Sequence, residues 1–196
     1  MDIQRPQSPR PIPPDAKRVF KGKIFEAYQW EQELYDGTKT TFEKLKRNDS
    51  VNVFPITDKG NIIIARQEQP GHAPFWGCVG GRLDEDETPL DGAKRELKEE
   101  TGYEADTYIL WDSVQPSATV EWAIYTFIAK DVKKTSEPSP DAGEKIELHE
   151  VTFDEFIGLS RRPDYRDKEI ALLIHRALGD PKKMEELRTL FSPSAL

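Results

Sequence analysis

Residues 81–103 read GRLDEDETPLDGAKRELKEETGY, and four glutamates of this stretch surround one short predicted helix. They are Glu87, Glu96, Glu99 and Glu100. The last three stand three and four residues apart, so on a helix they share one face, where like charges repel and cost stability. A chain that gathers acids in this way usually has a cation to place among them. Carboxylate oxygens suit Mg²⁺ or Mn²⁺.

The same stretch contains the signals that begin and end a helix. Thr88 is a good N-cap, Pro89 suits the first helical position, and Asp91 completes a pattern close to the capping box. Gly102 is a natural terminator. An apolar stripe at helical spacing faces the core and consists of Leu90, Ala93 and Leu97. Before the helix, residues 79–81 offer backbone with little side-chain bulk. Carbonyls there could join a metal shell, and amides could approach phosphate oxygens.

The stretch resembles the Nudix box, G-x5-E-x7-R-E-U-x-E-E-x-G-U, in which U is a bulky aliphatic residue. The matching positions are Gly81, Glu87, Arg95, Glu96, Leu97, Glu99, Glu100 and Gly102, and Tyr103 at the last U is the one departure. The bland alternative is a solvated, charged helix. It explains Lys94 and Lys98, but neither the two bracketing glycines nor a glutamate just before the cap.

The resemblance implies a role for each residue of the box. Glu96 and Glu100 are implied as direct metal ligands, with Glu99 ligating or acting through water. Glu87 would complete or orient the metal shell, to which Gly80 adds backbone. Arg95 would hold a carboxylate in position by charge-assisted hydrogen bonds. The residues that we expect to take part in catalysis are Arg95, Glu99, Glu100 and, outside the box, Glu144.

The assignment of Glu144 depends on a loop after the box. In the ADP-ribose pyrophosphatase branch of the family, the general base often comes from such a loop. Residues 141–147 are the only acidic loop in the right region. Glu144 is our first choice, followed by Glu147 and Asp141. A solvated loop acid is an equally good interpretation of each.

The composition of the chain argues against several other classes of function. The chain has 196 residues, enough for one domain with a small appendage, and a net charge of −8. An acidic protein is a poor candidate for nonspecific binding to nucleic acid or anionic membranes. We expect a cytoplasmic protein, because there is no run of transmembrane length and no signal-peptide pattern. The single Cys78 excludes an internal disulfide and is expected to be buried packing.

Four segments are expected along the chain. Residues 1–15 predict a flexible Pro-rich arm, residues 16–48 a β-hairpin with a dimerisation role, residues 49–180 the Nudix domain, and residues 181–196 a C-terminal helix and tail. Within the domain, strands precede and follow the acidic helix, and further helices end the chain. This order favours a mixed sheet between helices. The resemblance implies the α/β/α sandwich of Nudix proteins, with an N-terminal antiparallel sheet added.

The N-terminal hairpin is similar to that of the ADP-ribose pyrophosphatase branch. There, an N-terminal sheet swaps across a homodimer and helps to bind the nucleoside. We therefore expect a homodimer built through residues 18–46, since a lone hairpin is marginal in water. The alternative is that the hairpin folds back on its own domain. The expected substrate-binding residues are two aromatic and two cationic side chains, Tyr28, Trp30, Arg66 and Arg82; the aromatic pair could equally pack the sheet.

The predicted reaction is metal-dependent hydrolysis of the pyrophosphate bond of a nucleoside diphosphate linked to another group, most simply a nucleoside diphosphate sugar such as ADP-ribose. The segment before the box departs from that branch, as does Gln67-Glu68-Gln69, where an arginine is usual. A dinucleotide, another nucleotide sugar or an oxidised nucleoside triphosphate therefore stays open as the substrate. A house-cleaning triphosphate pyrophosphohydrolase and a non-catalytic nucleotide-binding domain are the alternative functions.

Overall fold

The computed structural model describes residues 3–140 and 143–194. Its strands are β1 (Lys17–Lys21), β2 (Glu26–Glu33), β3 (Lys39–Lys46), β4 (Ser50–Ile56), β5 (Ile62–Glu68), β6 (Phe75–Gly77), β7 (Tyr103–Glu104), β8 (Thr107–Val114), β9 (Val120–Glu121), β10 (Ile124–Lys130), β11 (Lys133–Lys134) and β12 (Lys145–Val151). Its helices are α1 (Pro89–Thr101), α2 (Phe153–Leu159), α3 (Lys168–Leu178) and α4 (Pro181–Leu190).

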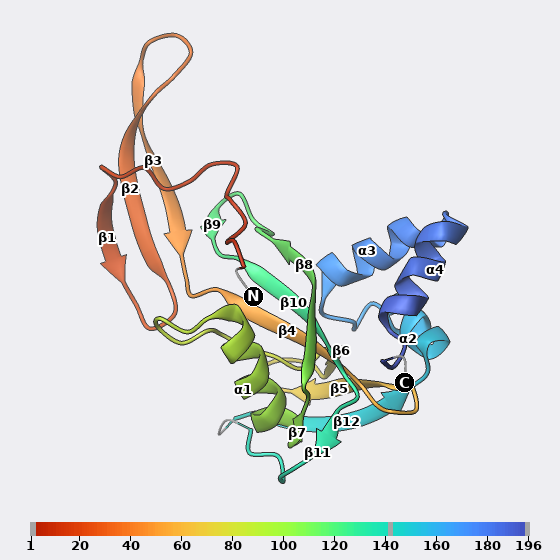
Figure 1. Ribbon diagram of the computed structural model, residues 1–196. Coiled ribbons are helices and arrows are strands. Elements are labelled where there is room, and N and C mark those ends of the chain that lie inside the picture. The colour runs from red at the N-terminus through yellow and green to blue at the C-terminus, as the bar shows by residue number, and fades with distance from the viewer. Residues whose placement is uncertain (1–2, 141–142, 195–196) are drawn as a thin grey trace.

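A mixed sheet forms the centre of the molecule. Its strands follow the order β12-β5-β4-β10-β8, and β6 pairs with β5. Strands β4 and β10 run parallel, whereas β8 is antiparallel to β10 and β12 is antiparallel to β5. Helix α1 lies on one side of this sheet, and α2, α3 and α4 gather on the other (Figure 1). The expected α/β/α sandwich with a mixed sheet is thus confirmed.

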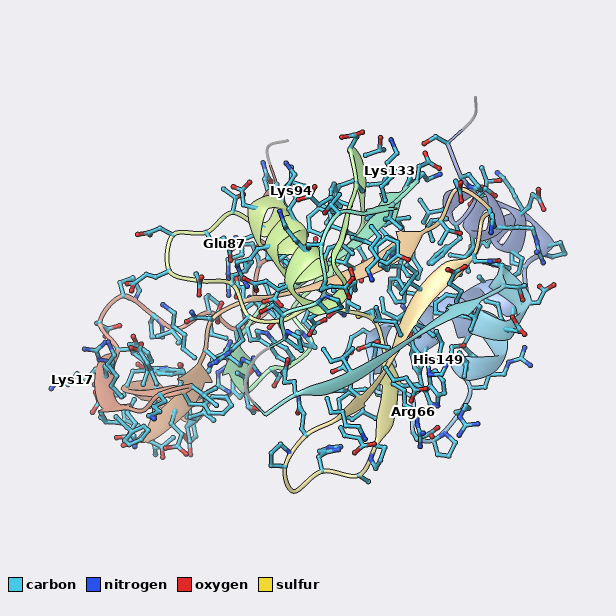
Figure 2. The ribbon with its side chains drawn as sticks, turned by 90° about the horizontal axis from the view of Figure 1, so that it is seen from below. Lys17, Arg66, Glu87, Lys94, Lys133 and His149 are labelled. Carbon is cyan, nitrogen blue, oxygen red and sulfur yellow. The ribbon has the colours of Figure 1, made fainter. Side chains whose placement is uncertain are left out.

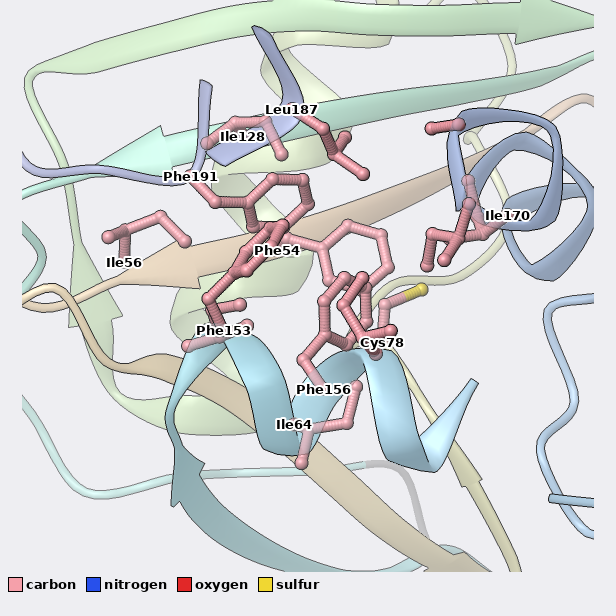
Figure 3. Packing of buried hydrophobic residues seen from close by; sticks show 14 of the residues in the cluster. Phe54, Ile56, Ile64, Cys78, Ile128, Phe153, Phe156, Ile170, Leu187 and Phe191 are labelled. Atoms are coloured by element: carbon pink, nitrogen blue, oxygen red, sulfur yellow. The ribbon is translucent and has the colours of Figure 1, made fainter. Parts of the chain in front are cut away.

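The central strands are apolar on both faces because helices cover both. On β5, Ile62 and Ile64 pack towards α2 and α3, while Ile63 and Ala65 pack towards α1. A strand has a side-chain period of two, so an unbroken apolar run is what a doubly covered strand requires. Phe54 of β4 belongs to the first of these clusters, together with residues of the C-terminal helices (Figure 3).

Helix α1 begins and ends where the sequence predicts. The Thr88 hydroxyl oxygen accepts the Asp91 backbone N–H at 3.2 Å. At the other end, Gly102 takes the left-handed conformation with a φ of 73° and donates its N–H to the Lys98 carbonyl. Ala93 and Leu97 are fully buried, which turns the acidic face of the helix away from the core and towards a cleft.

The N-terminal residues differ from the flexible arm expected for 1–15. From residue 3 onwards the segment lies against the protein. The Arg5 guanidinium donates to both carboxylate oxygens of Asp49, at 2.7 and 2.9 Å, and to Glu121 at 3.0 Å. The buried ammonium of Lys44 donates to the Ser8 hydroxyl and to the Arg10 carbonyl, each at 2.6 Å. Composition alone could not reveal these polar contacts, since their partners lie far along the chain.

The predicted N-terminal hairpin is present as β2 and β3, with β1 as a further strand. The hairpin projects from the body of the molecule in Figure 1. Short strand β9 joins it to the rest of the same chain, because Leu45 and Lys46 pair with Val120 and Glu121. The segment therefore has a contact with its own domain, as the second alternative predicted, while much of its apolar surface stays open.

The C-terminal helix is a structural part of the domain and not an appendage. Leu187 of α4 and the following Phe191 are buried in the cluster that contains Phe54. The Phe191 ring packs against Phe54, Trp111 and Phe156 with centroid separations of 5.2 to 5.7 Å. No helix within residues 3–140 and 143–194 has the length and apolar character needed to cross a membrane.

Candidate active site

A cleft of about 730 Å³ runs along the acidic face of α1. It is lined by the loop after β6, by the link between β3 and β4 with the start of β4, by the end of β5, and by the start of α3. Most of the residues expected at the site border it: Gly80, Arg82, Arg95, Glu96, Glu99, Glu100 and Glu144. The structure therefore brings box residues and one distant loop acid to a single surface.

Arg95 is the hub of the acidic cluster. Its guanidinium donates to both oxygens of Glu87, each at 2.9 Å, to Glu96 Oε1 at 2.9 Å and to Glu99 Oε2 at 3.0 Å. A fifth bond, at 3.0 Å, reaches the Arg82 carbonyl. These bonds raise the pKa of Arg95 further above its already high range and lower the pKa of Glu87. One fixed cation thus ties the loop before the helix to three of the four box acids.

The remaining acid, Glu100, is only 5% exposed and accepts the Gly80 N–H at 2.8 Å. Burial raises its pKa to about 8, and the charges of Glu96, Glu144 and Glu99 act in the same direction. Burial likewise raises the pKa of Glu96 against the opposing effect of Arg95. Desolvation and like charge both penalise the ionised form, so this cluster is electrostatically unfavourable without a further cation.

The two glycines before the helix allow the loop to lie against these carboxylates. Gly80 has a φ of 139°, and a Cβ there would stand 2.2 Å from the Val51 carbonyl oxygen. A Cβ on Gly81 would stand 2.5 Å from Glu96 Oε1. A larger residue at position 80 would therefore clash with the backbone of β4, and one at position 81 would clash with the Glu96 carboxylate. The close approach is therefore the physical reason for two successive glycines here.

The chemistry of the donors fits a hard divalent cation. Glu96 and Glu100 are buried carboxylates on one helical face, and Glu99 borders the same cleft. Among residues 3–140 and 143–194, no three acidic, imidazole or thiol groups already converge as a bound metal would require. Arg95 accounts for this, because it engages one oxygen each of Glu96 and Glu99 and both oxygens of Glu87.

The cleft is also lined by cationic side chains, of which the sequence interpretation named Arg82 but neither Arg47 nor Arg166. Arg47, Arg82 and Arg166 all border the cleft. Burial, together with the charges of the other two arginines, lowers the pKa of Arg47. The Nε atom of Arg47 is buried and has no hydrogen-bond partner within the described residues. Its guanidinium stands 4.6 Å from the ring centre of Trp122, whose own indole N–H donates to the Ser50 hydroxyl. The cleft thus has an acidic side and a basic side.

Glu144 borders the same cleft as the carboxylates of the box. Its Oε1 accepts a bond from the Gln69 amide at 3.2 Å, and its charge contributes to the raised pKa values of Glu96 and Glu100. The second choice, Glu147, pairs with Arg66 on β5, and its side chain lies 3.4 Å from His149, away from the cleft lining. The third choice, Asp141, falls outside the described residues.

Arg66 was assigned to substrate binding, and this assignment is wrong for the cleft. On β5 the alternate residue, Gln67, faces the cleft and donates to the Cys78 carbonyl at 3.0 Å. Arg66 is exposed on the other face, where Figure 2 shows it near His149 and far from Glu87. A slip of one position reverses the face in a strand. The residues at the ends of β5 carry no pattern that indicates which face of the strand borders the cleft.

The two aromatic candidates are separated by the structure. Tyr28 lines a second cavity of about 630 Å³, which also touches Glu87 and shares Arg47, Asn48, Leu83 and Asp84 with the cleft. Trp30 borders neither space within one chain. It is buried between Phe42, at 6.2 Å, and the Arg10 guanidinium, at 5.4 Å. Trp30 therefore packs the N-terminal sheet, which was the alternative interpretation.

Comparison with known proteins places the chain in a family. The NUDIX domain model matches residues 46–182. An ADP-ribose pyrophosphatase of Bacillus subtilis (strain 168) is 30% identical over 162 residues, which cover 81% of this chain and 87% of that protein. The same shares apply to a methanol dehydrogenase activator of Bacillus methanolicus, at 26% identity. The chain therefore belongs to the Nudix family, and its intact box identifies it as a Nudix hydrolase.

Solved structures agree on the fold. The crystal structure of an ADP compounds hydrolase superposes with a TM-score of 0.69 at 21% identity and covers 93% of this chain and 99% of its own. The agreement extends over nearly the whole chain, so the N-terminal sheet and C-terminal helices are included in the shared fold.

The buried carboxylate of Glu100 leads to a prediction about pH. Its pKa in the folded protein, about 8, lies above the ordinary value of 4.5. Between these values the folded state holds more protons than the unfolded state, so the contribution of this group to stability is lost as the pH rises through 8. We expect Glu100→Gln to stabilise the metal-free protein at pH 8.5 by on the order of 2 kcal/mol, and by much less at pH 5.5.

Urea unfolding in EDTA at the two pH values measures this difference. The exposed acid Glu85 serves as the control, because Glu85→Gln should leave the free energy of unfolding nearly unchanged at both. Equal stability of wild type and Glu100→Gln at pH 8.5 would contradict the electrostatic account.

Proposed function

We propose that this protein hydrolyses the diphosphate bond of a nucleoside diphosphate sugar of the ADP-ribose type, giving a nucleoside monophosphate and a sugar phosphate. The observation that carries the proposal is that buried box carboxylates and three arginines line one cleft. A diphosphate needs charge neutralisation from both sides, because its oxygens repel an attacking water. The ADP-ribose pyrophosphatase and ADP compounds hydrolase among the relatives supply the substrate class.

Glu96, Glu99 and Glu100 are the residues that would hold Mg²⁺ or Mn²⁺, with Glu87 and the Gly80 backbone beside them. When bound, the cation neutralises diphosphate charge and acidifies water. Arg95 holds these carboxylates in position. It fixes the orientation of Glu87, Glu96 and Glu99 through bonds of 2.9 to 3.0 Å. It is therefore a positioning residue for the carboxylates.

The basic wall receives the anionic substrate. Arg47 is held between Trp122 and the neighbouring arginines without a carboxylate partner among the described residues. A guanidinium in this state is ready to donate several hydrogen bonds to phosphate oxygens. Arg82 and Arg166 add charge along the same wall. The nucleoside would extend towards the adjoining cavity, where Tyr28 offers an aromatic surface and Arg47 is shared by both spaces.

The first test is a substrate panel. With Mg²⁺ present, ADP-ribose should yield AMP and ribose 5-phosphate, and EDTA should abolish turnover because the reaction needs the cation. Chromatography of the products with ADP-ribose, a dinucleotide, an oxidised nucleoside triphosphate and a hexose-linked diphosphate separates the alternatives. Release of inorganic pyrophosphate from triphosphates alone would replace the proposal with a triphosphate pyrophosphohydrolase. A ligand-induced rise in Tm without turnover on any substrate would indicate a binding domain.

The second test concerns Glu144 as general base. Its position opposite Glu96 and Glu100 suits proton acceptance from water, and the loop brings it there from outside the box. We expect Glu144→Gln to lower kcat by about 100-fold with little change in the KM for the nucleotide. The matched control is Glu147→Gln on the opposite face, which should keep near-wild-type kcat. A fall of less than tenfold in Glu144→Gln would place the base elsewhere.

We further propose a homodimer through the N-terminal sheet. Most of the large apolar side chains that stay exposed in one chain belong to this segment: Val19, Phe20, Ile24, Phe25, Leu34, Tyr35 and Leu45. Apolar surface concentrated in this way marks an interface, since isolated exposed residues would be scattered. Packing against a second copy would also bring additional residues towards the cavity that Tyr28 lines.

Light scattering at micromolar concentration should give twice the chain mass of 22.5 kDa. The double substitution Val19→Glu and Phe20→Glu places charge on the exposed strand β1 and should yield a folded monomer. Leu172→Glu on the exposed side of α3 is the control and should remain dimeric. A monomeric wild-type protein with full activity would remove the dimer.

A further inference from the structure

Residues 77–81, at the end of β6 and the start of the loop that leads to α1, carry the backbone beside the box acids, and several elements hold this backbone by hydrogen bonds. Val79 and Gly81 accept N–H bonds from Val53 and Val51 of β4, at 2.8 and 2.9 Å. Gly80 donates to Glu100 of α1 at 2.8 Å. The backbone groups of Cys78, in contrast, have hydrogen-bond partners that belong neither to β4 nor to α1.

The peptide groups of Cys78 are held by two side chains. The Gln67 amide of β5 donates to the Cys78 carbonyl at 3.0 Å, and the Cys78 N–H donates to Asp167 Oδ2 at 2.8 Å. Asp167 lies 89 residues further along the chain, at the start of α3. Both side chains border the cleft. The sheet itself therefore does not fix this peptide; two polar side chains do.

A ladder of backbone bonds explains why a carboxylate is needed at this position. Residues 164–166 run beside β6: Trp76 donates its N–H to the Asp164 carbonyl at 2.9 Å, and Arg166 donates its N–H to the Trp76 carbonyl at 2.8 Å. The chain then turns into α3, so it presents no carbonyl to the Cys78 N–H. The Asp167 carboxylate takes that place and extends the ladder by one bond.

The position of Asp167 makes it a rigid support. It directly precedes α3, whose Ile170 and Ile174 are buried in the core, and it follows Tyr165, which is fully buried. Its carboxylate does not cap its own helix, since it makes no side-chain bond to the helical amides. A residue at the N-cap normally uses its side chain for that purpose. Here the carboxylate bonds to the loop instead.

Gly77 supplies independent support for this arrangement. A Cβ at position 77 would stand 3.2 Å from Asp167 Oδ2, tighter than ordinary van der Waals contact. The φ of Gly77 lies outside the left-handed range, so an alanine would fit the backbone without strain. The glycine is thus explained by the close approach of the carboxylate and not by the chain's conformation.

We propose that Asp167 is a positioning residue that fixes the loop at residues 77–81, and through it the geometry of the metal-binding backbone and of Glu100. Asp167 acts through the Cys78 peptide, to which its carboxylate is bonded. The proposal rests on the proposed function, since it assigns to the loop a role in holding the divalent cation. It also links the C-terminal helices, which lie on the far side of the sheet, to the catalytic cleft.

Asp167→Ala removes the acceptor and should weaken Mn²⁺ binding, measured by electron paramagnetic resonance or calorimetry, by about 10- to 100-fold. At fixed sub-saturating Mg²⁺, kcat for ADP-ribose should fall while the KM for the nucleotide changes little. Asp167→Asn keeps a carbonyl oxygen in the same place and should restore the Mn²⁺ affinity to within about threefold of wild type. This rescue separates a hydrogen-bond acceptor from a charge or a general base.

Two further variants complete the design. Asp164→Ala is the matched control, because its carboxylate only pairs with Arg162 and its backbone bond to Trp76 is retained. It should bind Mn²⁺ as wild type does. Gly77→Ala displaces the carboxylate by steric contact and should weaken Mn²⁺ binding, whereas the pair Gly77→Ala and Asp167→Ala should be no worse than Asp167→Ala alone, since both act on one bond.

The outcomes are distinguishable. Wild-type Mn²⁺ affinity in Asp167→Ala, or equal damage in Asp167→Asn and Asp167→Ala, would overturn the proposal. If Asp167→Ala does not fold, as judged by circular dichroism, then Gly77→Ala and Asp167→Asn decide, and unaltered affinity in Gly77→Ala would also overturn it. Absence of hydrolysis by the wild type on every substrate would remove the proposed function, while the metal-affinity series would still test the support of the loop.

Discussion

The arrangement of the rest of the site depends on the hydrogen bonds that Arg95 makes. Its guanidinium binds Glu87, Glu96 and Glu99 and the Arg82 carbonyl, and so joins the loop before α1 to the helix itself. Without this internal cation, like charges at helical spacing would destabilise the first element of the site. Arg95 offsets only part of that repulsion, because Glu96 and Glu100 still have raised pKa values. The helix therefore forms, but the negative charge on its acidic face is not fully compensated by Arg95.

The fold holds this helix against a sheet that is buried on both faces. Ala93 and Leu97 anchor α1 to one face, and the C-terminal helices cover the other. The site is therefore assembled from elements that are distant in sequence and rigid in space. Arg47 comes from the link between β3 and β4, Glu144 from the loop before β12, and Arg166 from the segment before α3. All three side chains come from connecting segments, whose ends are held by the strands and helices that they join.

Local patterns in the sequence predicted the acidic part of the cleft, but in the basic part only Arg82 was expected. The box residues lie within one helix and its flanking loop, so capping, periodicity and glycine positions determine their arrangement. Arg47 and Arg166 carry no such pattern, because their roles arise only when the sheet brings them together. The assignment of Arg66 failed for a related reason. Which side chains of β5 face the cleft depends on which face of the sheet α1 covers. The contacts of Arg5 and Lys44 with the N-terminal segment were also long-range and left no signal in composition.

The basic half has its own energetic logic. Arg47 is partly buried, flanked by Arg82 and Arg166, and its Nε lacks a partner within the described residues, so the free protein carries an incompletely satisfied cation. Burying such a group has a cost that an arriving anion can offset. The box acids are also incompletely compensated, but their uncompensated charge is negative. Under the proposed function, a diphosphate accompanied by a divalent cation would compensate the acids and the arginines together, whereas either ion alone would compensate only one of the two groups. The net charge of −8 opposes binding of a free anion at long range. The proposed function therefore predicts selectivity for the metal complex of the substrate, because of the arrangement of charge inside the cleft.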